Sequence, residues 1–473
     1  MRTIDVAIIG AGSAGIAARS EVARVTDDYL VIDHGTLGTT CARVGCMPSK
    51  AFIQVANDFH RRHVLEEMGV VGADGLSVDR GKVMAHVRRL RDAFVAAVLK
   101  DMRTWQEHVL PGSAQLLDGE TLIVGEERIK ANRIVLATGS SPVMPEAWRP
   151  FAADLVDTDQ FFEQETLPDR MAVIGLGAIG IELGQALQRL GIEVIGVSLN
   201  KAVGGLTSPA LQDYAVRLVA KDMRVLFGAA EIDGRSNPGL AVRVGSEKFE
   251  ATKALVALGR RPNLKGLGLE RLGIILDARG LPPLDRESLR IKGTSIYLAG
   301  DATGGRSTLH EAVDEGRMPG YNAAHTDDHC FKRRVRLAIT FSDPNIAIVG
   351  KSWKELTDEG TAFVVGEADF ARQGRAVVMR ENEGSIEVYA DRASGRLLGA
   401  ELMAPRGEHL AHLLAFALSM NMTVPESLSL PFYHPAIEEG LRTALKDAAF
   451  KIERRVRDIE LMRCSEPPAG GSV

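Results

Sequence analysis

Ile4-Asp5-Val6-Ala7-Ile8-Ile9-Gly10-Ala11-Gly12-Ser13-Ala14-Gly15 is the segment from which the architecture of this chain follows. Its apolar first half predicts a buried strand, and its second half carries the pattern GxGxxG at Gly10, Gly12 and Gly15. A helix and a second strand ending in Asp33 are expected next. Such glycines permit a tight turn and the approach of a pyrophosphate to a helix N-terminus, and an acid about twenty residues on binds a ribose 2′-hydroxyl. The segment therefore predicts a dinucleotide-binding fold.

The same pattern recurs in the middle of the chain. Met171 to Ile174 predicts a strand, and the glycines of the next loop are Gly175, Gly177 and Gly180. A helix over residues 181–190 and a strand over residues 193–197 are expected to follow. Two dinucleotide folds in one chain imply electron transfer between two bound cofactors.

The second loop differs from the first at the position of the ribose acid. Where an acid would stand, the sequence reads Ser198-Leu199-Asn200-Lys201. Ser198 can bond a ribose hydroxyl, whereas Lys201 either attracts a 2′-phosphate or is a solvated loop lysine, and we favour the solvated lysine. Gly180 and the lack of an arginine pair favour NAD, and NADP stays the alternative.

Cys41 and Cys46 lie in the run Cys41-Ala42-Arg43-Val44-Gly45-Cys46-Met47-Pro48-Ser49-Lys50. Two cysteines five apart on a regular helix cannot bond, so a redox disulfide here needs a distorted turn. Pro48 suits the first turn of a helix and places Cys46 at its N-terminus, where the macrodipole favours a thiolate. A structural disulfide or a metal pair is the alternative. Zinc sites need about four ligands, however, so no metal site is expected.

Composition narrows the class of protein. The chain has 473 residues, 45% of them hydrophobic, with a net charge of −5 and a pI near 6.2. A net negative charge does not indicate binding to nucleic acid or to an anionic membrane surface. No apolar run approaches the roughly twenty residues of a membrane span. Four cysteines and no leader predict a cytoplasmic location. We treat Cys330 and Cys464 as incidental thiols.

Turn-rich segments and strand patterns predict the domain boundaries. Residues 1–150 are expected to form the first part of one dinucleotide-binding domain, 151–265 a second such domain and 266–335 the return segment of the first; the family resemblance described below implies FAD for the first domain and NAD(P) for the second. Residues 336–460 form an α+β unit with a long helix around Glu408 to Met420, and residues 461–473 a disordered tail. The charged stretch between Asp79 and Val109 predicts a scaffold helix pair.

Further motifs, in order along the chain, carry a family resemblance. They are Ala137-Thr138-Gly139-Ser140, Leu258-Gly259-Arg260-Arg261-Pro262-Asn263, Ala299-Gly300-Asp301-Ala302, Phe341-Ser342-Asp343-Pro344 and His434-Pro435-Ala436-Ile437-Glu438-Glu439. From residue 2 to about residue 460 the chain resembles the class I pyridine nucleotide-disulfide oxidoreductases, and among them most closely the dihydrolipoamide dehydrogenases. The resemblance implies an α/β protein with two Rossmann-like domains, for FAD and NAD, and a C-terminal α+β dimerisation domain.

The resemblance also implies roles for individual residues. Cys41 would exchange with substrate sulfur and Cys46 would face the flavin. His434, from the other subunit of a homodimer, would be the acid–base, oriented by Glu439. Lys50 and Glu182 match a pair near the flavin and nicotinamide rings. FAD would be held by Gly10, Gly12, Gly15, Asp33, Ala114, Thr138, Gly139 and Asp301. The nicotinamide cofactor would be held by Gly175, Gly177, Gly180, Ser198 and Gly259.

The predicted reaction is the oxidation of dihydrolipoyl groups with NAD, on a small dithiol or a lipoyl domain. A reductase of another small disulfide using NAD(P)H, or a redox-sensing or structural flavoprotein subunit, is the alternative. The chain departs from the common family pattern before and after the first cysteine, with Gly38-Thr39-Thr40 for Gly-Gly-Thr and Arg43 for asparagine. Arg43 either acts on the disulfide or an acidic substrate, or forms a salt bridge across the dimer.

Overall fold

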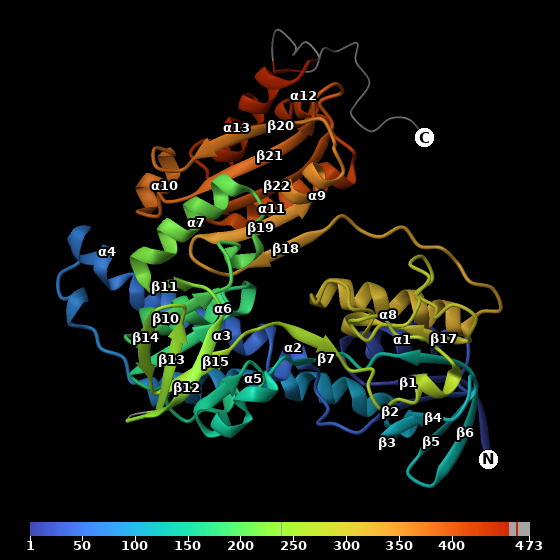
Figure 1. Ribbon diagram of the computed structural model, residues 1–473. Helices are drawn as coiled ribbons and strands as arrows, with labels where there is room; N and C mark the ends of the chain where they lie inside the picture. Colours follow the sequence, from blue (N-terminus) through green and yellow to red (C-terminus); the bar gives the residue numbers. More distant parts are fainter. Residues whose placement is uncertain (238, 454–459, 462–473) are drawn as a thin grey trace.

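The first sheet is built around β1 (Arg2–Ile9), whose second half is buried because both of its faces are covered. The computed structural model describes residues 1–237, 239–453, 460 and 461. β1 pairs in parallel with β2 (Tyr29–Asp33) and β6 (Glu127–Leu136). Helices α1 (Ser13–Val22) and α8 (Leu309–Ala324) pack against each other and contact β1 and β6 (Figure 1).

The remaining strands of this sheet come from distant parts of the chain. β3 (Val109–Pro111) pairs with β2, and an antiparallel hairpin of β4 (Ala114–Leu116) and β5 (Thr121–Val124) extends β6. β17 (Ile296–Leu298) pairs in parallel with β6 after the chain has passed through the second unit. The first unit is therefore interrupted by the second, as the recurring strand pattern predicted.

The second unit is a parallel sheet with the strand order β11-β10-β9-β15-β8. Its strands are β8 (Leu155–Asp157), β9 (Arg170–Ile174), β10 (Glu193–Ser198), β11 (Arg224–Phe227) and β15 (Lys253–Val256). Helices α6 (Ala178–Arg189) and α7 (Pro209–Asp222) connect β9 to β11, and the strands β12 (Ala230–Ser236), β13 (Gly239–Val244) and β14 (Glu247–Ala251) form an antiparallel layer. The chain enters and leaves side by side, because β7 (Ser140–Pro142) pairs with β16 (Arg260–Pro262).

The third unit is an antiparallel sheet with the order β18-β19-β22-β21-β20. Its strands are β18 (Leu337–Thr340), β19 (Asn345–Gly350), β20 (Phe363–Asp369), β21 (Ser385–Asp391) and β22 (Leu397–Ala404). Helix α11 (Gly407–Ser419) packs on β19 and β22, and α13 (Glu438–Lys451) packs on β20 and β21. The shorter helices are α9 (Trp353–Asp358), α10 (Gly374–Met379) and α12 (Val424–Leu428). Two parallel α/β units and an α+β unit confirm the predicted fold class.

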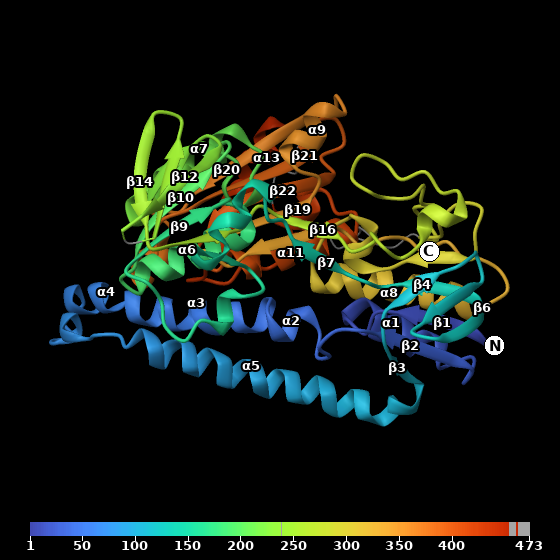
Figure 2. The ribbon, with the colours of Figure 1, turned by 60° about the horizontal axis from the view of Figure 1, so that its bottom comes forward.

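The helical segment after the first fold contains one correction. α5 (Arg80–Met102) is a single helix capped by Asp79, and a 3₁₀ segment (Arg103–His108) follows it, so the predicted helix pair within this stretch is wrong. No proline or inner glycine breaks α5 after its first turn. Its partner is α3 (Cys46–His60), from outside the stretch, and Figure 2 shows α5 running along α3 and α2 (Thr40–Arg43). α4 (Arg62–Glu67) follows α3.

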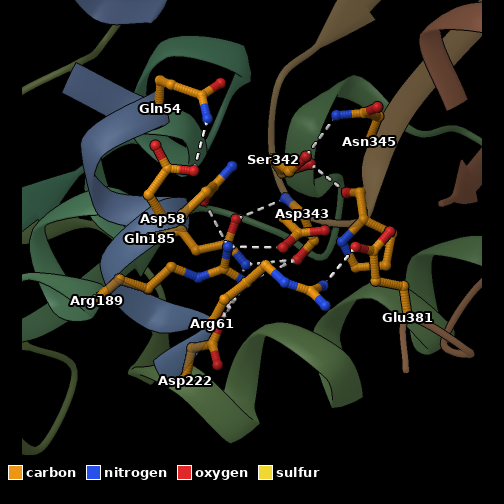
Figure 3. A network of polar contacts seen from close by, with 12 residues as sticks. Gln54, Asp58, Arg61, Gln185, Arg189, Asp222, Ser342, Asp343, Asn345 and Glu381 are labelled. Carbon is orange, nitrogen blue, oxygen red and sulfur yellow. Dashed lines mark hydrogen bonds and ion pairs between the residues drawn. The ribbon is translucent and has the colours of Figure 1, made fainter. Parts of the chain in front are cut away.

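A buried polar junction joins the three units (Figure 3). Arg189, at the end of α6 with a side chain only 6% exposed, donates to Asn57 of α3 at 2.6 Å and to Asp343 at 2.7 Å. Gln185, one turn earlier, donates to Asp222 of α7 at 2.8 Å and accepts from the Asp343 N–H at 2.7 Å. The segment before β19 is therefore bonded to α6 of the second unit, and the same Arg189 side chain links α6 to α3 of the first unit. The boundaries at residues 150, 265 and 335 stay predictions, and the predicted tail lies outside the described residues after Leu461.

Candidate active site

Cys41 and Cys46 face each other across a break between two helices. α2 ends at Arg43 and α3 begins at Cys46, with Gly45 between them at φ −117° and ψ −113°, far from helical values. Any larger residue at this position would be crowded, since a Cβ on Gly45 would lie 3.1 Å from the Thr40 carbonyl oxygen. Both cysteines are half-buried free thiols. The distorted turn expected from the spacing is present.

The two thiols perturb each other in opposite directions. The hydrogen bond with Cys41 and the charge of Lys50 lower the pKa of Cys46 to about 7, against the opposing effect of burial. The same contact and burial raise the pKa of Cys41 above its ordinary value of 9.0. At neutral pH the dithiol therefore holds its negative charge on Cys46, at the N-terminus of α3.

Lys50 and Glu182 join the redox helix to the second unit. The Lys50 Nζ lies 3.0 and 2.8 Å from the two carboxylate oxygens of Glu182, whose side chain is 7% exposed. Glu182 also accepts the Phe341 N–H at 2.7 Å, and the Lys50 Nζ lies 4.6 Å from the centre of the Phe341 ring. A cation is thereby fixed one turn after Cys46.

The first glycine loop is closely packed on one side and open on the other. Gly10 has φ +110°, and a Cβ there would lie 2.3 Å from the Ala137 carbonyl oxygen, while one on Gly15 would lie 1.8 Å from the Gly10 carbonyl oxygen. A Cβ on Gly12 would meet nothing within 4 Å. Asp33 accepts the Ala11 N–H at 2.6 Å. The loop thus offers exposed backbone at the start of α1, as a cradle for a pyrophosphate requires.

The second loop repeats this geometry. Gly175 has φ +100° with its Cβ position 2.3 Å from the Ala257 carbonyl oxygen, and that of Gly180 lies 1.8 Å from the Gly175 carbonyl oxygen. A Cβ on Gly177 would again meet nothing within 4 Å. The internal repeat read from the sequence is therefore a repeat of structure.

Next to the first loop, an orphaned polar atom fits a bound group. The Thr138 hydroxyl is buried and has no hydrogen-bond partner among the described residues. Gly139 follows at φ +67° with open space at its Cβ position. Asp301 accepts from the Ser140 hydroxyl at 2.6 Å. These residues fit the flavin site predicted for them, whereas Ala114 lies in the ladder of β4 opposite Val124, in the apolar core.

A cavity of about 810 Å³ surrounds the second loop. Of the predicted nucleotide residues, Gly175, Gly177, Ser198 and Gly259 line it. Gly180 and Glu182 do not, because their side of α6 is buried. The Ser198 hydroxyl makes no hydrogen bond to another described residue. The fold thus provides a nucleotide-sized pocket around the second loop, at the carboxyl ends of parallel strands.

Sequence reasoning missed several residues that shape the two sites. Arg260 donates to the Ser140 hydroxyl at 2.9 Å and to Asp159 at 2.7 Å, so it supports the partner of Asp301. The buried Thr308 hydroxyl, at the start of α8, also has no partner among the described residues, and Gly228 and Ala229 also line the cavity. No local pattern marks these positions.

His434, in the loop before α13, forms a hydrogen-bonded pair with Glu439 in the first turn of that helix. The His434 Nδ1 lies 3.0 and 3.1 Å from the Glu439 carboxylate oxygens, and this contact lowers the pKa of Glu439. His434 is 80% exposed. In both views of the molecule α13 lies away from α2, the helix that carries Cys41 (Figures 1 and 2).

Comparison with models of known protein families assigns the chain to a family. Residues 4–316 match the pyridine nucleotide-disulphide oxidoreductase model. The chain belongs to this family. Residues 337–445 match the dimerisation domain of the pyridine nucleotide-disulphide oxidoreductases, which supports a homodimer. Membership makes the protein a flavoprotein enzyme that uses a flavin and a pyridine nucleotide.

Individual relatives agree with the family assignment. The mitochondrial dihydrolipoyl dehydrogenases of Homo sapiens and Macaca fascicularis are each 29% identical to the chain, over 94% of it and 91% of theirs. LpdA from Mycobacterium tuberculosis has a TM-score of 0.78 at 24% identity, covering 94% of this chain and 99% of that one. The flavoprotein disulfide reductase RclA from Escherichia coli has a TM-score of 0.81 at 19% identity, with the same coverages. The two structures show the shared fold.

The described residues contain neither a candidate membrane span nor a candidate metal site. No helix there is long and apolar enough to cross a membrane. No group of three or more His, Cys, Asp or Glu side chains is placed to hold a metal ion in that part of the chain.

Proposed function

We propose that this protein oxidises dihydrolipoyl groups with NAD, as a cytoplasmic homodimer that takes a small dithiol or a lipoyl domain as its substrate. The observation that carries the proposal is the contact between Cys41 and Cys46, with the pKa of Cys46 near 7. A dithiol with one acidic thiol is suited to exchange with another dithiol. The 29% identity to dihydrolipoyl dehydrogenases over nearly the whole chain supports this choice of substrate.

In the proposed thiol–disulfide exchange, Cys41, Cys46 and His434 each have a separate role. His434 of the partner subunit takes the proton of a substrate thiol, and the resulting thiolate attacks the Cys41 sulfur of the disulfide. The Cys41–Cys46 bond breaks and Cys46 leaves as a thiolate, which its lowered pKa favours. The second substrate thiol then releases its proton to solvent, and the thiolate so formed displaces Cys41 from the mixed disulfide. The substrate leaves as a disulfide, and Cys41, whose pKa is raised, takes the proton back from His434.

Other residues hold the cofactors. FAD, when bound, would supply the two-electron redox chemistry that links the dithiol to the nucleotide. Gly10, Gly12 and Gly15 receive its pyrophosphate, Asp33 its ribose, and the Thr138 hydroxyl supplies a free hydrogen-bonding group. The second loop and Ser198 hold the nicotinamide nucleotide. Lys50, fixed by Glu182, supplies a positive charge near the flavin ring.

The alternative is an NAD(P)H-dependent reductase of another small disulfide, and the approach to Cys41 favours it. Thr39, where the common family pattern has glycine, is held at φ +62°, a conformation that L side chains rarely adopt. Arg43 donates to the Thr36 carbonyl oxygen at 3.0 Å and forms no ion pair with a described residue. Its charge is therefore free for an acidic substrate.

Anaerobic reduction of the purified holoprotein separates the two functions. We expect dihydrolipoamide to bleach the flavin absorbance at 450 nm or so, and NAD to restore it with a higher specificity constant than NADP. Dihydrolipoamide that leaves the flavin oxidised, while NADH or NADPH supports turnover of another disulfide, would establish the alternative.

A further inference from the structure

A solvent-exposed ion pair lies just after Ser198 and Leu199, two residues that line the pocket around the second glycine loop. The Nζ of Lys201, three residues after Ser198, lies 2.8 Å from the Asp213 carboxylate of α7. The two side chains are 58% and 53% exposed. This contact also lowers the pKa of Asp213, so the carboxylate stays ionised at neutral pH.

The position of the pair matters because the end of the second strand is where such folds read the adenosine ribose. An acid there binds the 2′-hydroxyl, and a nearby cation accommodates a 2′-phosphate. Here the strand ends in Ser198, whose hydroxyl is free and lines the pocket. The Asn200 side chain is already used, because it accepts the Ala202 N–H at 3.0 Å. Lys201 is thus the one cation in residues 198–202.

We propose that Asp213 is a specificity-determining residue, which keeps the pocket selective for an unphosphorylated ribose by neutralising Lys201. A 2′-phosphate carries a charge of roughly −1.5 to −2 and needs a free cation. With Asp213 ionised, Lys201 is held by α7, and the pair adds no net positive charge to the end of the strand at Ser198. Without that carboxylate, the flexible lysine stem is free to reach a phosphate at Ser198.

This inference rests on the proposed binding of a nicotinamide nucleotide in the pocket, and it concerns nucleotide choice alone. It does not depend on which dithiol the enzyme oxidises. Nucleotide binding without turnover therefore tests it.

The experiment is calorimetric titration of the holoprotein with adenosine 5′-monophosphate and with adenosine 2′,5′-bisphosphate. Asp213→Asn removes the charge and keeps the side-chain shape. We expect it to tighten binding of the bisphosphate by about fivefold to tenfold, as one released charge near water allows, and to change binding of the monophosphate by less than about twofold. The gain should shrink at high salt.

Two further variants identify the cause. Lys201→Ala in the Asp213→Asn protein should abolish the gain, because the lysine is the group that is released. Asp358→Asn breaks a comparable exposed pair with Lys354 on α9 and should leave both affinities unchanged. If Asp213→Asn gives no gain, or the gain survives without Lys201, the role of Asp213 is rejected while the proposed function stands. If neither ligand binds the unaltered protein, the nucleotide pocket itself is wrongly assigned, and the inference falls with it.

Discussion

At the scale of single residues, the chemistry of Cys46 is set by its neighbours. The Cys41 side chain, and then the charge of Lys50, stabilise its thiolate, and burial opposes them. Because the pKa of this acid is lowered, the group is charged above about pH 7 and neutral below it. The dithiol should thus lose reactivity as the pH falls through neutrality.

Alkylation of the reduced protein measures this directly. The rate of carbamidomethylation at Cys46, followed by peptide mass, should rise with pH to a midpoint near 7. In Cys41→Ala the largest cause of the low pKa is lost, so the midpoint should move up toward the ordinary thiol value. Equal midpoints in the two proteins would contradict the assigned interaction.

Gly177 and Gly180 form a matched pair for testing the second loop. A Cβ at position 180 would lie 1.8 Å from the backbone oxygen of Gly175, so Gly180→Ala should lower the free energy of unfolding by about 3 kcal/mol. Gly177→Ala meets open space at an ordinary φ of −67°, and its stability should change little. Its methyl group would nevertheless occupy the cradle, so we expect nucleotide affinity to fall by roughly tenfold. Chemical denaturation and titration with NAD separate the two effects.

At the scale of elements, the junction around Arg189 holds α3 against α6 and the start of the third unit. Removing one partner of a buried ion pair costs about 3–5 kcal/mol, and less where the other partner reaches solvent. Since the Asp343 side chain is 42% exposed, we expect Arg189→Met to lower the free energy of unfolding by about 2 kcal/mol. Arg170→Met removes the exposed pair with Glu193 in the same unit and should cost less than about 0.5 kcal/mol. Similar losses in both variants, measured by denaturant unfolding, would show that the junction contributes no special stability.

Elements were predictable from sequence where their signals are local. The two glycine loops and the helix break at Gly45 follow from residue spacing, and the long C-terminal helix predicted around Glu408 to Met420 is α11. Partners brought together by the fold were not predictable. The partner helix of α5 is α3, and the carboxylate that binds Lys201 belongs to Asp213 of α7. The unsatisfied Thr138 hydroxyl is visible only when its surroundings are known.

At the scale of the whole molecule, the proposed mechanism needs two chains. His434 is bonded to Glu439 and otherwise exposed, in a loop between α12 and α13. α13 packs on α12 and on the sheet strands β20 and β21, whereas Cys41 lies on α2 beside α3 and α5. The matched dimerisation domain contains this histidine, so a two-fold axis can place it against the cysteines of the partner.

Mixed dimers test this arrangement. Homodimers of Cys41→Ser and of His434→Ala should each lose activity by roughly a thousandfold, because each lacks one group of every site. In a heterodimer of the two variants, one composite site lacks both groups and the other has both intact, so activity should return to about half of the unaltered level. Native mass spectrometry would confirm that subunits have exchanged. Heterodimers as inactive as both parents would rule out a site shared between subunits, and the role proposed for His434 would be lost with it.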